Sequence, residues 1–266
     1  MLRSVEDLET FGVEATDGRI GRLVDFYFDD KFWAVRFLVV KTDEWAEGRT
    51  VLISPLASGR PDAAAKVLPA RVTRAQVRMS PDVDTHKPVS RQHEVENYGY
   101  YGYPFYWGGS GMWGNSTLPA LLLAAGAGAE ATGLTPKQQA FVEGQAAFHR
   151  QRGDDPHLRS CRAISGYHLQ ASDGEVGHVE GFIVDDESWA IRYLVVNTSD
   201  WWLGHQVLIA PPWIADISWI DATVHVDLTR QAVKDARRYD GQPLPDRVKE
   251  RVLHDHYGRA GYWGDD

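Results

Sequence analysis

Two segments of the chain repeat one another at a long, fixed offset. Residues 17–42 and 173–198 match at 13 of 26 positions without a gap, and the offset of 156 residues holds as far as Pro55 and Pro211. The same offset returns in two aromatic segments further along. Stacked repeat arrays have periods of about 20–50 residues, so a repeat of this length is a whole domain. The sequence therefore predicts an internal duplication.

The duplication divides the chain into two repeats and a connector. We predict a first repeat with an aromatic tail over residues 1–107, a linker with a helix over residues 108–157, and a second repeat with an aromatic tail over residues 158–266. The linker begins with a Gly/Ala-rich stretch over residues 108–133, a composition typical of flexible connectors. A helix at about 135–152 is expected after it, because Pro136 suits a first turn and apolar residues recur at helical spacing.

Each repeat contains short runs of strand-forming residues separated by turn signals. The expected strands lie at residues 11–15, 20–29, 33–40, 51–54 and 75–79, and at 167–171, 176–185, 189–196, 207–210 and 223–228. Asp17-Gly18 and Asp173-Gly174 indicate β-hairpins between the first two strands of each repeat, because glycine accepts a positive φ. The strands at 33–40 and 189–196 are apolar on both faces and are expected to be covered on both. This pattern favours a mainly β fold of two small, closed or nearly closed barrels.

Short helices and aromatic tails are expected after each barrel. Thr229 is placed to cap a short helix in the second repeat, and Pro81 suits a helix start in the first. The tails around 101–107 and 257–263 combine glycine with large aromatic rings. We expect both tails to fold back onto a barrel.

The composition narrows the class of protein. The chain has 266 residues, of which 43% are apolar and 24% charged, as in globular proteins with room for two domains. No stretch approaches the roughly 20 apolar residues of a membrane span, and the acidic N-terminus is unlike a signal peptide. We therefore expect a cytoplasmic protein without direct membrane insertion. The net charge of −9, with no basic run, argues against nucleic acid as a partner, and the single Cys161 excludes an intrachain disulfide.

Several strings in the second repeat carry a family resemblance. They are LRS at 158–160, GYH at 166–168, DGEVGHVEGFIVDDESWAIRYLVV at 173–196 and WWLGHQVLIAP at 201–211. These strings resemble the PRC-barrel family, and the chain is similar to its bacterial tandem members over residues 2–60, 158–230 and the aromatic tails. The resemblance implies a small β-barrel in each half. It also implies a role in binding or assembly, because the same module forms the cytoplasmic part of the photosynthetic reaction-centre H subunit and the C-terminal domain of a ribosome maturation factor.

Two acidic pairs, Asp29-Asp30 and Asp185-Asp186, follow long predicted strands. Paired carboxylates can serve acid/base catalysis, but adjacent residues of a β-segment point to opposite faces, and a turn explains both pairs better. We therefore predict no catalytic residues. Asp29 is expected to form an ion pair with Arg36, and Asp185 with Arg192, because each arginine lies within an otherwise apolar strand.

The sequence His254-Asp255-His256 has the alternation of a metal site, since imidazole nitrogens suit zinc or nickel. The first repeat has Tyr98 and Tyr100 at the equivalent positions, so the duplicated scaffold does not require a metal. Packing or surface histidines are the preferred interpretation. His254 and His256 are kept as candidate ligands.

Aromatic residues suggest where a partner binds. Trp201 and Trp202 lie next to Gly204 in a predicted loop, where two adjacent bulky rings do not both enter a small core easily. Aromatic side chains are enriched in binding hot spots. The interface candidates are Trp201, Trp202, Tyr101, Trp107, Tyr257 and Trp263.

Together these features favour a non-enzymatic protein-interaction or assembly module without a cofactor, which binds a protein partner or a second copy of itself. Two alternatives stay open. The first is a small-molecule or metal-binding regulatory module that uses the region near His254 and His256. The second, implied by the resemblance alone, is a peripheral component of a membrane electron-transfer assembly like that of the reaction-centre H subunit.

Overall fold

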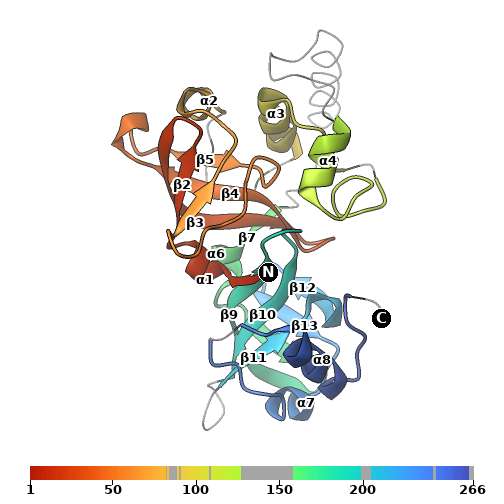
Figure 1. Cartoon of the computed structure of the whole chain (residues 1–266). Helices are drawn as coiled ribbons and strands as arrows, with labels where there is room; N and C mark the ends of the chain where they lie inside the picture. The colour runs from red at the N-terminus through yellow and green to blue at the C-terminus, as the bar shows by residue number, and fades with distance from the viewer. Residues whose placement is uncertain are drawn as a thin grey trace. The chain divides into compact units, whose positions relative to one another are not determined.

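The chain folds into two compact units, and neither is contiguous in sequence. Unit 1 comprises Met1–Glu6, Cys161–Asp185 and Ile191–Asp266, and unit 2 comprises Asp7–Ser160 and Asp186–Ala190. The structure is a computed structural model that describes residues 1–81, 83, 89, 91–107, 109–126, 158–198, 205–241 and 244–263 (Figure 1). The helix predicted at about 135–152 lies outside these residues. No helix in the described ranges is long and apolar enough to cross a membrane.

Unit 2 contains a mixed sheet with the strand order β5-β4-β3-β2-β6, and β7 pairs with β3 beside this path. The strands are β2 (Gly12–Ala15), β3 (Gly18–Asp29), β4 (Ala34–Thr42), β5 (Thr50–Ile53), β6 (Val67–Pro69) and β7 (Leu158–Ser160). The helices are η1 (Glu44–Ala46), α2 (Arg74–Met79), α3 (Arg91–Tyr101) and α4 (Pro119–Gly126), and α1 (Val5–Leu8) spans the boundary between the units in sequence. All strand pairs of the sheet are antiparallel except β2 with β6.

Unit 1 contains a second mixed sheet with the order β11-β10-β9-β8-β13-β12, and β1 pairs with β9 beside this path. The strands are β1 (Leu2–Ser4), β8 (His168–Ala171), β9 (Gly174–Asp185), β10 (Ile191–Asn197), β11 (Gln206–Ile209), β12 (Ile214–Ser218) and β13 (Thr223–Val226). The helices are α6 (Cys161–Ile164), η2 (Pro211–Trp213), α7 (Arg230–Lys234) and α8 (Arg247–His256). Here the parallel pair is β8 with β13.

The elements of the two halves recur at the offset found in the sequence. β3 and β9 both have 12 residues and begin at Gly18 and Gly174, and the hairpins predicted before them are present as β2–β3 and β8–β9. Helices α3 and α8 begin at Arg91 and Arg247, again 156 residues apart. The order of elements is therefore closely similar in the two halves.

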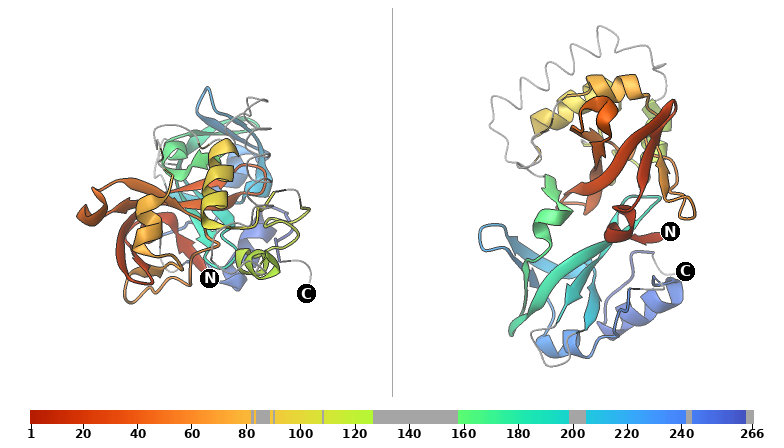
Figure 2. Two further views of the ribbon diagram at one scale, coloured as in Figure 1. Left: turned by 90° about the horizontal axis from the view of Figure 1, so that it is seen from above. Right: turned by 90° about the vertical axis from the view of Figure 1, so that its left-hand side faces the viewer.

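The first strand of each half completes the sheet that is built mainly from the other half. Ser4 of β1 pairs with Ile183 of β9, and Ser160 of β7 pairs with Tyr27 of β3 (Figures 1 and 2). Both strands have the sequence Leu-Arg-Ser, and both pair in the same register at the 156-residue offset. Sequence reasoning placed residues 1–6 with the first half, whereas the structure groups them with unit 1.

The core of each unit lies around its central strands. β4 is buried at eight of its nine positions, and Phe37 and Val39 are almost fully buried. In unit 1, the adjacent residues Tyr193 and Leu194 of β10, whose side chains point to opposite faces, are fully buried. Both strands are thus covered on two faces, as their apolar sequences predicted. Each such side chain contributes about 1.5–3 kcal/mol through removal from water.

The prediction of a mainly β fold is confirmed, but the two small, closed or nearly closed barrels expected are instead two mixed sheets whose strand order does not close among the described residues. One expected strand, residues 75–79, is part of the helix α2. Thr73 accepts a hydrogen bond from the Gln76 backbone and Gln76 bonds back to Thr73, a capping box that starts a helix. The segment expected to extend the sheet beyond β6 is therefore helical. In unit 1, Thr229 caps α7 as predicted.

Gly21 and Gly177 mark close approaches of two strands. Both lie within the long strands β3 and β9. A Cβ atom at either position would lie 2.0 Å from a carbonyl oxygen of the neighbouring strand, that of Lys41 or Asn197. Glycine at these positions allows the close approach of two backbones.

Candidate functional site

Both predicted ion pairs are in contact in the structure, in different surroundings. Asp29 at the end of β3 accepts a hydrogen bond from Nε of Arg36 on β4, and the two residues are 3% and 0% exposed. In unit 1 the two side chains are further apart and meet through a different nitrogen, with 3.5 Å between Nη2 of Arg192 and Oδ2 of Asp185. About one fifth of each of these side chains is exposed. Unit 2 therefore contains the buried version of a pair that unit 1 leaves partly in solvent.

In unit 2 the arginine continues into an aromatic and charged cluster that holds the tail. The guanidinium carbon of Arg36 lies 3.8 Å from the ring centroid of Tyr106, whose hydroxyl donates a hydrogen bond to buried Glu94 of α3. Glu94 is also 3.0 Å from Nη1 of Arg91, and the guanidinium of Arg91 lies over the Trp107 ring at 4.2 Å. Cations and rings alternate from β4 through the tail to α3, an arrangement that stabilises the docked tail.

Unit 1 contains the same cluster 156 residues later. Arg192 lies 3.9 Å from the centroid of the Tyr262 ring, and the Tyr262 hydroxyl donates a 2.8 Å hydrogen bond to Glu250 of α8. Arg247 lies 3.2 Å from Glu250 and stacks over Trp263 at 4.4 Å. We call these two groups the tail clusters. Their helix residues follow an Arg-x-x-Glu spacing that sequence reasoning missed, although the constant offset extends to both copies.

The tyrosines of the tail clusters act as hydrogen-bond donors. Burial, with the neighbouring Glu94, raises the pKa of Tyr106 well above its ordinary value. Burial and the hydrogen bond to Glu250 raise the pKa of Tyr262 to about 12. Both hydroxyls therefore stay protonated at neutral pH and remain able to donate to the carboxylates.

Next to the tail clusters, Tyr98 of unit 2 corresponds to His254 of unit 1. The Tyr98 hydroxyl lies 3.1 Å from Oγ of Ser54. His254 is 3% exposed; its Nε2 lies 3.2 Å from the Tyr193 hydroxyl and its Nδ1 2.9 Å from the carbonyl of Ala260. Burial lowers the pKa of His254 despite the opposing effect of the Ala260 carbonyl.

In both candidate metal ligands, ring nitrogens already lie within hydrogen-bond distance of protein atoms. His254 lies among aromatic rings, and Nε2 of the exposed His256 lies 2.8 Å from the carbonyl of Ala232. Among the described residues, no group of three or more His, Cys, Asp or Glu side chains is arranged to hold a metal ion. Metal binding by this histidine pair therefore remains a prediction.

The aromatic interface candidates fall into two groups. Trp201 and Trp202 lie outside the described residues. The other four make ring contacts within their own unit: Tyr101 with Tyr103, Trp107 with Phe105, Tyr257 with Trp213 and Trp263 with His254. An additional role for these rings at an interface stays a prediction.

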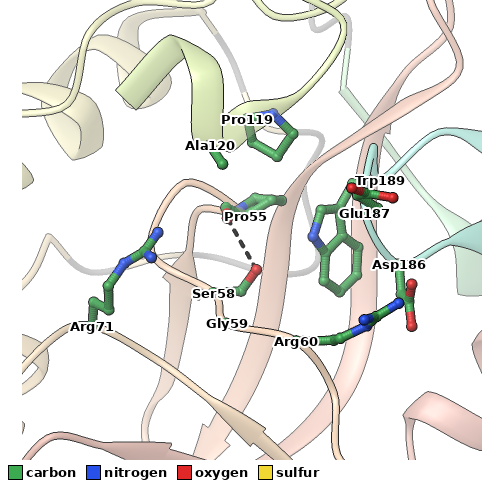
Figure 3. Close-up of a pocket in the computed structure, with 10 residues that line it drawn as sticks. All are labelled: Pro55, Ser58, Gly59, Arg60, Arg71, Pro119, Ala120, Asp186, Glu187 and Trp189. Atoms are coloured by element: carbon green, nitrogen blue, oxygen red, sulfur yellow. Dashed lines mark hydrogen bonds between the residues drawn. The ribbon is translucent and has the colours of Figure 1, made fainter. Parts of the chain in front are cut away.

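Unit 2 also contains a pocket of about 280 Å³ next to Trp189 (Figure 3). Its walls come from the loop after β5, Arg71 between β6 and α2, the start of α4 and the turn between β9 and β10. Trp189 is 2% exposed and has a left-handed backbone with φ of 57°. Its carbonyl accepts a 2.8 Å hydrogen bond from the backbone of Val35, and Nε1 of Trp113 donates to the Ser188 carbonyl at 2.9 Å. Sequence reasoning missed this pocket because its parts are far apart in the chain.

Comparisons with known proteins leave the family open. No family model matches the chain, and no curated protein matches it.

Proposed function

We propose that this chain is a non-enzymatic tandem protein of the PRC-barrel type that serves as a protein-interaction or assembly module. The recurrence of elements at one offset and the presence of a tail cluster in each unit support an internal duplication. The open sheets differ from closed barrels, and an open sheet leaves strand edges available for binding.

The observation that carries the proposal is the edge strand β12 of unit 1. It pairs with β13 on one side and is the last strand on the sheet path of the described residues, and the N–H of its first residue, Ile214, donates to the carbonyl of Pro211. At the tip of the β12–β13 hairpin, Ile220 is 97% exposed. An unpaired edge beside an exposed apolar side chain is a template on which an extended segment of another protein can add as a further strand.

The corresponding region of unit 2 lacks such an edge. It forms isolated bridges, Ser58 with Ala70 and Asp62 with Val67, and carries Pro61 between them. Proline at a sheet edge removes a backbone donor and opposes strand addition. Unit 1 is therefore the better place for a strand-like partner.

The charge near β12 favours a basic partner. Asp216 within the strand and Asp221 beside the hairpin tip are exposed, and the chain carries a net charge of −9. Complementary charge increases the rate of encounter and disfavours wrong partners. The preferred occupant is a segment that alternates apolar residues with Lys or Arg.

A peptide of alternating Lys and Val, about seven residues long, tests the proposal. We expect saturable binding by fluorescence anisotropy and slower amide exchange over residues 214–218. Ile220→Ser, which removes the exposed apolar side chain without adding charge, and Asp216→Lys should each weaken binding at least about tenfold, a change of about 1.4 kcal/mol. Met79→Ser, at an exposed apolar position of unit 2, is the matched control and should bind normally.

Two results would count against this function. The first is peptide binding that is equal in all variants, and the second is the absence of saturable binding. Light scattering over a concentration series tests for self-association, because a dimer that is lost in Ile220→Ser identifies a second copy of the chain as the partner. A peripheral role in a membrane electron-transfer assembly rests on the resemblance alone and stays an alternative.

A further inference from the structure

Unit 1 contains a pocket of about 130 Å³ beside β11, at the opposite end of the sheet path from β12. Figure 1 shows helix α8 next to β11. Leu208 of β11 and Leu253 of α8 both line the pocket, and they are 4% and 6% exposed. Pro245, just before α8, adds to this apolar wall. One side of the pocket is therefore apolar and fixed by core packing.

The polar side of the pocket carries an excess of positive charge. Arg237, Arg238 and Lys249 line it together with one carboxylate, that of Asp240. Nε of Arg238 lies 2.6 Å from Oδ1 of Asp240, so these two charges offset one another. Neither Arg237 nor Lys249 has a carboxylate within ion-pair distance in the part of the chain that the structure describes. The pocket therefore carries two positive charges that no carboxylate of the described residues pairs with.

Two further acidic residues near the pocket have other roles. Asp246 is the N-cap of α8, and its Oδ1 accepts a 2.9 Å hydrogen bond from the Lys249 backbone. Glu6 acts on Tyr239, because burial and this carboxylate together raise the pKa of Tyr239 to about 12. Tyr239 is therefore neutral at physiological pH and adds no negative charge to the pocket.

The backbone on the polar side of the pocket is anchored at two points. The N–H of Tyr239 donates a 2.8 Å hydrogen bond to the carbonyl of Gln206 on β11. The second anchor is the capped first turn of α8, which carries Lys249. The segment with Arg237 and this helix turn are thus both held by the protein, so a ligand loses little free energy in ordering their backbones.

We propose that this pocket binds a phosphoryl group, as free phosphate or as the head of a small monoester. Arginine presents its donors in a fork that matches phosphate oxygens, and lysine adds a point charge. Two cations without carboxylate partners suit a dianion better than a monocarboxylate. The volume of about 130 Å³ is well below the range of about 300–1,000 Å³ for drug-sized ligands, which limits the enclosed part to a group of this size. This site is independent of the assembly function proposed for β12.

The duplication predicts one such site in each chain. At the 156-residue offset, Arg237 corresponds to Pro81. Lys249 corresponds to His93, whose pKa is lowered by burial. The first half therefore has no fixed positive charge at either position. Binding at a single site in unit 1 is expected.

Calorimetry of the full-length chain with inorganic phosphate, ethyl phosphate and acetate tests the proposal, at about pH 8, where phosphate is mainly a dianion. We expect one site per chain, at which both phosphates bind at least about tenfold more tightly than acetate. Tighter binding of ethyl phosphate than of phosphate would identify a monoester as the ligand, because the apolar wall then contacts the ethyl group. Equal or weaker binding of ethyl phosphate would identify free phosphate.

Three variants locate the bound phosphate. Arg237→Gln and Lys249→Gln should each weaken phosphate binding at least about tenfold, and Arg237→Lys should retain part of the affinity. Lys234→Gln makes the same change of charge at an exposed lysine of α7 that does not line the pocket. It is the matched control and should leave binding unchanged.

Four results would overturn the proposal. The absence of saturable binding by either phosphate would exclude a phosphoryl site. Acetate that binds as tightly as phosphate would show that the pocket does not select a dianion. Unchanged affinity in both Arg237→Gln and Lys249→Gln, with circular dichroism like that of the parent, would place the bound phosphate elsewhere. An equal loss in Lys234→Gln would reduce the effect to the net charge of the chain.

Discussion

Replacement of Asp29 by asparagine is expected to destabilise unit 2 strongly, whereas the matched change at Asp185 should affect unit 1 little. Asp29 is 3% exposed and is the carboxylate that pairs with the fully buried Arg36. The two terminal nitrogens of Arg36 have no hydrogen-bond partner among the described residues, and its guanidinium lies against the rings of Tyr106 and Trp113. Removing the Asp29 charge therefore leaves a buried cation without its counter-ion.

The magnitude follows from burial. Loss of one partner of a buried ion pair costs about 3–5 kcal/mol, because the remaining charge stays desolvated. Asparagine keeps an oxygen that can accept the 2.7 Å hydrogen bond from the Phe32 backbone, so the change tests the charge. The Asp185–Arg192 pair is partly solvated at 3.5 Å, and such pairs contribute about 0–1 kcal/mol.

Urea denaturation combined with amide exchange resolved by unit measures both changes. We expect faster exchange over β3 and β4 in Asp29→Asn, and nearly parental exchange over β9 and β10 in Asp185→Asn. Adding Arg36→Met to Asp29→Asn should recover part of the lost stability, because the unpaired cation is then absent. Equal losses in the two single variants, or a loss below about 1 kcal/mol for Asp29→Asn, would refute this reasoning.

Three further predictions follow from particular contacts. Burial lowers the pKa of His254 from its ordinary value of 6.5, so this side chain binds a proton more readily in the unfolded chain than in the folded one. Unit 1 should therefore lose stability as the pH falls below about 6.5. His254→Tyr should remove that dependence, as measured by denaturation at a series of pH values. Trp113→Phe removes the hydrogen bond to Ser188 at a cost of about 0.5–1.5 kcal/mol, seen as faster amide exchange in the turn 186–190; unchanged exchange would contradict the role of this contact. Gly177→Ala should cost about 1–3 kcal/mol because its Cβ would meet a backbone oxygen, whereas Gly181→Ala has open space and should change thermal stability by less than about 0.5 kcal/mol.

Local signals in the sequence predicted much of each sheet. Asp17-Gly18 marked the first hairpin, and the doubly apolar run after Trp33 marked a strand covered on both faces. Thr229 marked the start of α7. These features depend on residues close together in the chain, which is why a single sequence reveals them.

Features that depend on distant segments were not predictable in the same way. β1 and β7 share the sequence Leu-Arg-Ser, so either could pair with β3 or with β9. The sequence alone does not indicate which of the two strands pairs with which sheet. Each tail cluster joins a strand, a helix and a tail. The Arg-x-x-Glu spacing on the helix does not by itself predict these contacts, because they depend on how the three elements pack together. The pocket beside Trp189 depends on a turn supplied by the other half.

The exchange of first strands is the central claim about this fold, and a disulfide test addresses it directly. In a Cys161→Ser background, we would oxidise Ser4→Cys/Ile183→Cys and the control Ser4→Cys/Tyr27→Cys, then map the linked peptides by mass spectrometry. Paired residues of antiparallel strands lie about 4.5–5.5 Å apart between Cα atoms, within reach of a disulfide. The account predicts a link between positions 4 and 183 and none between 4 and 27. A link between 4 and 27, with none between 4 and 183, would show that each half keeps its own first strand and would contradict the account.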